Sequence, residues 1–227
     1  MSLNNALNDI RSGKMVLVYD FDDRECETDM TIASQFAAPN VLRTMRKDGG
    51  GLICTTTPFN IARDLGLPFL SDVFFDPVKY PLLKAMAPND IPYDDTRSSF
   101  GVTINHRKTF TGVTDNDRSF TITEYVKTIF SDATAEERMI SLGNNFRAPG
   151  HVHLLNASEK VLESRRGHTE LTTALMIMAG VRPSATICEM IGDDGDAMPK
   201  EEAKLYARKN GYTFVEGDEI TEEWKKR

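Results

Sequence analysis

Apolar and polar positions along the chain form blocks that predict β-strands and α-helices in alternation. Apolar, β-branched or alternating runs predict strands at 15–19, at 52–57, along FGVTINH, at 151–155, along SATICEMI and along YTFVEG, of which the continuous run at 15–19 suits a buried strand. Amphipathic spacing predicts helices at 4–12, 39–47, 58–66, 121–130, 134–141, 169–179 and 199–210, with a short helix after the last strand. Because the alternation runs to the last residues without a linker or repeat, we expect an α/β (α+β) fold in one domain, residues 1–227.

Three segments lack a clear period. Residues 20–30 (DFDDRECETDM) leave the first strand as an acidic loop, and TIASQFAA follows as a strand or a mixed segment. Residues 69–99 contain many turn-forming residues, which predicts an irregular excursion. TGVTDNDRSFTI is interpreted as a polar loop that enters a β-type segment.

The composition narrows the possible function classes. The net charge of −7 argues against a general nucleic-acid binder, although a locally basic pocket could still take a small anion. Three widely spaced cysteines favour a reducing compartment over a disulfide framework. No apolar run approaches the ~20 residues that span a bilayer. We therefore expect a cytoplasmic protein that binds neither nucleic acid nor a membrane.

The acidic stretch is the first candidate site, with four aspartates, two glutamates and one arginine in residues 20–30. In an extended chain Glu25, Glu27 and Asp29 project to one side, where their carboxylates repel unless a cation or a proton lies among them. Mg²⁺ suits carboxylate ligands, and Arg24 adds a donor for a substrate oxygen. A solvated surface loop explains the same residues, so both interpretations stay open.

The second candidate site precedes the helix predicted at 169–179. It consists of Arg165, Arg166, Gly167, His168 and Thr169. A helix N-terminus attracts anions, arginines bind phosphate oxygens as forks, and glycine lets the backbone approach a ligand closely. These features favour an anion site over the plain alternative, a helix capped by Thr169. A histidine in this place could also complete a Mg²⁺ shell.

Three further positions could carry chemistry. His151 and His153 share one face of the predicted strand. They could bind a metal together, or one histidine could act as a proton shuttle. Glu189 ends an apolar run, so it is either a buried acid–base group with a raised pKa or the partner of an arginine. Residues 106–118 form either a substrate loop or a solvated hairpin, and composition does not rank these two.

Four motifs then line up in order: DRECETDM, TGVTDNDR, RAPGHV and RRGHTE…CEMIGDDG. Together they resemble 3,4-dihydroxy-2-butanone 4-phosphate synthase of riboflavin biosynthesis, nearly end to end and closest to the single-function archaeal form. The resemblance implies a three-layer α-β-α sandwich with a mixed twisted sheet. It also implies a lyase that converts D-ribulose 5-phosphate to L-3,4-dihydroxybutan-2-one 4-phosphate and formate with Mg²⁺ or Mn²⁺.

The same resemblance implies roles for the acidic stretch. Glu25 matches a ligand that bridges two metal ions, and His168 matches the histidine ligand. Arg24, Asp29 and Glu27 match sugar-binding positions, and Glu27 or Asp29 would remove the first proton. Cys26 and Thr28 depart from the Asn and Gly that bacterial members usually carry.

For the rest of the site, the resemblance assigns residues 165–169 to the phosphate cradle, although Arg166 stands where many members have glycine. Glu189 matches a substrate-binding and catalytic position, and His151 matches a catalytic one. The resemblance further implies a homodimer with its active site at the interface.

Two other function classes remain possible on the sequence. One is another Mg²⁺-dependent sugar-phosphate enzyme, an isomerase or an aldolase, which would release no formate. The other is a non-catalytic sugar-phosphate sensor, which would bind ribulose 5-phosphate without consuming it.

Overall fold

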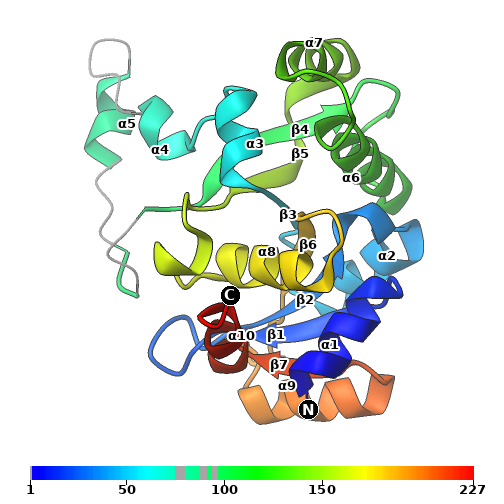
Figure 1. Cartoon of the computed structure of the whole chain (residues 1–227), viewed down its shortest axis with the longest axis vertical. Coiled ribbons are helices and arrows are strands. Elements are labelled where there is room, and N and C mark those ends of the chain that lie inside the picture. The colour runs from blue at the N-terminus through cyan, green and yellow to red at the C-terminus, as the bar shows by residue number, and fades with distance from the viewer. Residues whose placement is uncertain (1, 75–79, 87–90, 94–96) are drawn as a thin grey trace.

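The centre of the molecule is one mixed sheet of seven strands in the order β4-β5-β3-β6-β2-β1-β7 (Figure 1). The computed structural model describes residues 2–74, 80–86, 91–93 and 97–227. The strands are β1 (Val16–Tyr19), β2 (Thr28–Ala33), β3 (Cys54–Thr57), β4 (Phe100–His106), β5 (Phe146–Asn156), β6 (Ala185–Glu189) and β7 (Thr213–Glu216). The β1–β7 and β3–β5 pairs are parallel and the remaining neighbours are antiparallel, so the predicted mixed sheet is confirmed.

Helices cover both faces of this sheet and bury one core on each face. The α-helices are α1 (Ser2–Arg11), α2 (Pro39–Asp48), α3 (Phe59–Asp64), α4 (Leu70–Phe74), α5 (Pro81–Met86), α6 (Asp115–Ile129), α7 (Ala135–Asn145), α8 (His168–Ala179), α9 (Lys200–Asn210) and α10 (Gly217–Trp224). One core receives side chains from α2, α6 and α9, and the other from α1, α8 and α10. This arrangement confirms the predicted three-layer sandwich.

The alternation of side chains along the central strands explains why the sheet carries two cores. In β1, Leu17 belongs to the core under α2 and α6, whereas its neighbours Val16 and Val18 belong to the core under α8. Successive residues of a strand point to opposite faces, so an unbroken apolar run is buried on both sides. The continuous run at 15–19 was therefore a reliable strand signal.

Most predicted elements are confirmed, with shifted ends. The acidic loop is shorter than expected, because Thr28 and Asp29 already belong to β2, and TIASQFAA continues this strand before a 3₁₀ turn at Ser34–Phe36. The strand predicted at 151–155 extends over Phe146–Asn156. Within the part of the chain that the structure describes, none of the helices combines the length and hydrophobicity that crossing a bilayer needs.

One prediction was wrong in type. TGVTDNDRSFTI does not enter a β-segment, because α6 begins at Asp115. The Thr114 side chain accepts a hydrogen bond from the Asp117 amide and caps this helix, and Asp115 and Asp117 suit its first turn. The cap residue and the acidic first turn were the helix signal that the strand interpretation missed.

The excursion at 69–99 is more ordered than predicted where the structure describes it. Helices α4 and α5 lie within it, both short and without a buried residue. The prediction also covers 75–79, 87–90 and 94–96, which lie outside the described residues. The last part of the excursion leads into β4 and contributes to the candidate site.

Candidate active site

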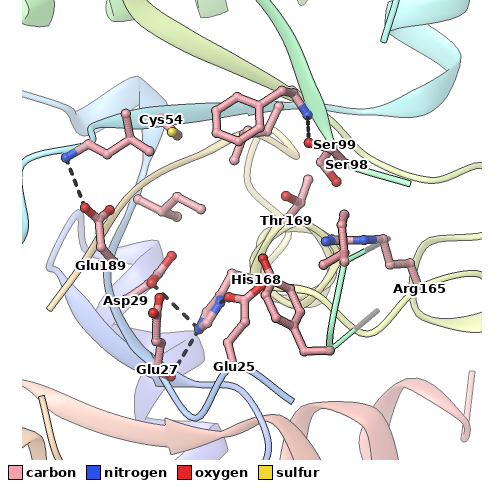
Figure 2. A pocket seen from close by; sticks show the side chains of 16 residues that line it. Glu25, Glu27, Asp29, Cys54, Ser98, Ser99, Arg165, His168, Thr169 and Glu189 are labelled. Atoms are coloured by element: carbon pink, nitrogen blue, oxygen red, sulfur yellow. Dashed lines mark hydrogen bonds and ion pairs between the residues drawn. The ribbon is translucent and has the colours of Figure 1, made fainter. Parts of the chain in front are cut away.

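A cavity of about 210 Å³ lies where the acidic loop, the start of α8 and the ends of several strands meet (Figure 2). Its lining residues are Glu25, Glu27, Asp29, Leu52, Cys54, Ile91, Tyr93, Ser98, Ser99, Phe100, Leu155, Arg165, His168, Thr169, Ile187 and Glu189. Both sites that the sequence singled out, the acidic stretch and the segment before α8, therefore open into one cavity.

The buried carboxylate of Asp20 fixes the shape of the acidic loop. It accepts hydrogen bonds from the backbone amides of Glu25 and Glu27, each at 3.0 Å, and from the Arg24 guanidinium at 3.2 Å. Between the two amides, Cys26 has a left-handed backbone with φ of 57°. The chain is thus not extended here as predicted, yet Glu25, Glu27 and Asp29 still line the same cavity.

His168 is the first residue of α8 and lies buried among these carboxylates. Its Nδ1 lies 3.1 Å from Glu25 Oε2, its Nε2 lies 3.3 Å from the Glu27 carbonyl oxygen, and Asp29 Oδ1 is 3.7 Å from Nε2. The helix N-cap is Gly167, so Thr169 is not the cap that the plain alternative required. Figure 2 shows these groups converging on the imidazole.

The charges of this cluster are strongly coupled. Burial by itself would raise the pKa of Glu25, but the hydrogen bond and the charge of His168 outweigh it and hold that pKa at about 2. Burial would lower the pKa of His168, but Asp29 and Glu25 raise it to about 9. Without a metal, a protonated imidazole is therefore the cation among the carboxylates, as their mutual repulsion demands.

Three further carboxyls of the cavity have pKa values above their ordinary range. Burial, helped by the neighbouring carboxylates, raises the pKa of Asp29 to about 7, and burial also raises the pKa of Glu27. Asp29 and Glu189 are direct partners across the antiparallel pair β2–β6. Burial raises the pKa of Glu189 as well, and its Oε1 accepts the Leu52 amide at 3.2 Å.

The donor set fits a hard divalent cation. Ligand atoms of Asp20, Glu25 and His168 lie within 4.8 Å of one another. Asp20 already accepts three hydrogen bonds from the loop, so Glu25 and His168 are the members of this group that could hold a metal, with Glu27 and Asp29 beside them. Carboxylate oxygens and one imidazole nitrogen suit Mg²⁺ or Mn²⁺ better than a thiophilic ion.

Arg165 and Thr169 line the cavity on a different side from the carboxylates (Figure 2). The guanidinium of Arg165 lies 2.8 Å from Glu170, a fully buried carboxylate that also accepts the Ser158 amide. A Cβ at Gly167 would approach Arg165 Nη1 to 1.9 Å, so only glycine permits this placement. A fixed arginine beside the N-terminus of α8 forms an anion-attracting end of the cavity.

The structure places four predicted site residues outside the lining of this cavity, namely Arg24, His151, Arg166 and Gly167, which is the N-cap of α8. Arg24 is buried behind the loop, 2.7 Å from Glu25, with its guanidinium over the Tyr93 ring. Arg166 points to the Asp23 carboxylate. His151 is exposed on β5, where its backbone amide donates to Asn105 and its ring contacts the same side chain.

Sequence reasoning missed several lining residues. Cys54 lies in an apolar strand, and Ile91, Tyr93, Ser98 and Ser99 come from the excursion, so no local pattern marked them. Residue type alone did not distinguish Asp20 from the other acids of the loop. Its position directly after a buried strand was the one signal available for its organising role.

A seven-stranded α/β sandwich whose cavity has a carboxylate–histidine cluster on one side and an arginine beside a helix N-terminus on another is typical of enzymes that handle small anionic substrates with a divalent cation. The chain matches the family model for 3,4-dihydroxy-2-butanone 4-phosphate synthase over residues 4–223. It therefore belongs to this family of riboflavin-biosynthesis enzymes.

Named relatives of similar length match the whole chain. The chain is 43% identical to the 3,4-dihydroxy-2-butanone 4-phosphate synthase of Methanothermobacter thermautotrophicus over 98% of this chain and 95% of the relative. It is 42% identical to that of Archaeoglobus fulgidus, over 100% of this chain and 95% of the relative. These archaeal relatives confirm the resemblance that the motifs indicated.

Solved structures agree on the fold. A 3,4-dihydroxy-2-butanone 4-phosphate synthase crystallised in complex with two magnesium ions superposes with a TM-score of 0.77 at 23% identity, over 99% of this chain and 96% of that one. A two-domain synthase from A. baumannii superposes with a TM-score of 0.73 at 25% identity, over 95% of this chain and 55% of that one.

Proposed function

We propose that this protein is a lyase that converts D-ribulose 5-phosphate to L-3,4-dihydroxybutan-2-one 4-phosphate and formate, using Mg²⁺ or Mn²⁺. The observation that carries the proposal is the contact between Glu25 and His168 inside a cavity with carboxylates on one side and Arg165 on another. The family and the names of the archaeal relatives support the choice of reaction.

Glu25 and His168 would hold the metal, as two ions in one site. A solved relative in complex with two magnesium ions supports this number. When bound, the ions polarise the substrate carbonyl and acidify the neighbouring C–H bond. Because a ligating imidazole must be neutral, His168 has to release its proton as the metal enters.

The anion end would hold the phosphate. Arg165 offers a guanidinium fork, while Thr169 and the open N–H groups of α8 beside Gly167 add donors. Glu170 holds the guanidinium in place. Since the phosphate is remote from the bonds that change, this end would orient the sugar and set its KM.

Asp29 or Glu27 would act as the first base and take the proton from C3, which gives an enediol. A carboxyl with a pKa of about 7, as in Asp29, suits that transfer near neutral pH. The C1 hydroxyl then leaves as water, the carbon skeleton shifts, and addition of water releases C4 as formate. Glu189, opposite Asp29 on the next strand, would serve the later proton transfers.

We further infer that residues 1–227 form one synthase domain and that two copies build the active site together. His151 lies outside the cavity of its own chain, so a role in catalysis requires that it reach the site of a second copy. Phe110 is 94% exposed and Val113 is 50% exposed, and their loop contacts β5 through the Arg147 hydrogen bond to the Phe110 carbonyl. Exposed apolar side chains beside His151 suit such an interface.

The test is incubation of the protein with uniformly ¹³C-labelled ribulose 5-phosphate and Mg²⁺, followed by carbon NMR. We expect formate and a four-carbon ketone phosphate in equal amounts, abolished by EDTA and restored by Mg²⁺. Consumption of the substrate without formate would identify an isomerase or an aldolase instead. Binding without consumption would identify a sensor.

A further inference from the structure

Two segments far apart in the sequence lie side by side and carry the two candidate metal ligands. The Arg166 guanidinium lies 3.2 Å from Asp23, and two residues further along each segment His168 lies 3.1 Å from Glu25. Both contacts join residues separated by 143 positions, so the segments stay in register. The outer contact therefore fixes the same alignment that brings the two ligands together.

Arg166 makes a second contact with the acidic loop. Its guanidinium lies 4.7 Å from the centre of the Phe21 ring, and Phe21 is buried next to Asp20. The positive charge of Arg166 thus lies over the fixed ring of Phe21 and pairs with the carboxylate of Asp23, two residues after Phe21. A guanidinium with both partners is held more firmly than one in a simple surface ion pair.

We propose that Arg166 is a positioning residue, which with Asp23 and Phe21 holds the acidic loop against the start of α8 and thereby pre-forms the Glu25–His168 metal pair. This inference rests on the proposed metal role of those two residues. It replaces the expectation that Arg166 binds phosphate, since its guanidinium lies outside the cavity lining. A pre-formed pair binds a divalent cation more tightly, because binding then orders less of the chain.

The test measures metal and phosphate binding separately and without substrate. We expect Arg166→Ala to weaken Mn²⁺ binding, followed by electron paramagnetic resonance, about three- to tenfold, as two partly exposed contacts allow. Inorganic phosphate binding, followed by calorimetry, should stay unchanged. Asp23→Asn should weaken Mn²⁺ binding to a smaller extent, and combining it with Arg166→Ala should add almost nothing.

Two variants separate positioning from a general effect on folding. The first is the charge swap, which combines Arg166→Asp with Asp23→Arg and restores an ion pair of reversed polarity. It should bind Mn²⁺ more tightly than Arg166→Asp alone or Asp23→Arg alone. Arg63 is a matched control, because it also pairs with a carboxylate, Asp64, and lies over a ring, Phe59, but outside the site. Arg63→Ala should leave Mn²⁺ binding unchanged.

Weakened phosphate binding with unchanged Mn²⁺ binding in Arg166→Ala would overturn the proposal and return Arg166 to the phosphate cradle. Unchanged binding of both, strict additivity with Asp23→Asn, or no gain from the charge swap would overturn it as well. Because no substrate is present, these outcomes do not depend on the reaction. Absence of formate from the wild-type protein would instead refute the proposed function.

Discussion

The acidic loop and the β5 segment around His151 both looked rich in chemistry in the sequence. Of the two, only the loop contributes predicted site residues to the candidate cavity of its own chain. In the loop, Asp20 binds two backbone amides and Arg24, which turns Glu25 and Glu27 toward His168. On β5, His151 has Asn105 as its partner and faces outward. Residue types thus indicate possible chemistry, whereas the fold and the assembly decide which groups meet.

Removing Glu25, the proposed metal ligand of the loop, should have the largest effect. Glu25→Gln keeps the shape of the side chain but removes the charge that pairs with His168, so we expect formate release to fall by a factor on the order of 10³. The measurement is kcat/KM by formate assay, with circular dichroism to confirm the fold. Near-normal turnover would mean that the loop holds no metal through Glu25.

The β5 side of the comparison is tested by mixing inactive variants. We expect His151→Ala to lower kcat about 10²-fold, the scale of a lost proton-transfer group. If His151 serves the second copy, refolding the His151→Ala variant in equal amount with the Glu25→Gln variant should restore about a quarter of wild-type activity. Half of the dimers are then mixed, and one of the two sites in each mixed dimer is intact. If His151 serves its own chain, every site in the mixture carries a defect and nothing is restored.

A third prediction concerns the anion end of the cavity. Arg165→Ala should raise the KM for ribulose 5-phosphate about 10- to 100-fold with a smaller change in kcat, as expected for a lost charged hydrogen bond remote from the chemistry. Because this variant also leaves Glu170 buried without its partner, Arg165→Lys is the companion variant, and we expect about a tenfold rise. An unchanged KM in both variants would remove Arg165 from the cradle.

The pH dependence of stability should follow the protonated His168. Its pKa of about 9 in the folded protein lies above the ordinary value of 6.5, so its contribution is fully present below pH 6.5 and is lost as the pH rises through 9. In EDTA, we expect the free energy of unfolding to fall across this window by at most about 3 kcal/mol. His168→Gln should flatten the dependence, measured by urea unfolding. A dependence that persists in this variant would assign it to other groups.

The smallest expected effect concerns the turn at Cys26. A left-handed backbone disfavours residues with a Cβ, so Cys26→Gly should stabilise the protein by about 1 kcal/mol and raise Tm by about 2–4 °C. Cys26→Ala keeps the Cβ and serves as the control, with no gain expected. Equal Tm values for both variants would show that the turn holds no such strain.

The sequence was informative where a signal is local. The arginines before α8 indicated a site at the start of this helix, although only Arg165 lines the cavity, and the position of Glu189 after an apolar run indicated a strand end at the site. The strand partners of these residues could not be predicted, because pairing depends on the order of all seven strands. For the same reason, no local sequence pattern indicated that Cys54 from β3 and Tyr93 from the excursion line the cavity.

The opposition of Asp29 and Glu189 across β2 and β6 has a geometric consequence. Cross-strand partners in an antiparallel pair have Cβ atoms about 5 Å apart, and the sheet keeps this separation constant whatever the loops do. If both acids exchange protons with the substrate, as proposed, the reacting carbons must lie within reach of this pair. The backbone of the sheet would then limit the length of the substrate, together with the groups proposed to bind the phosphate.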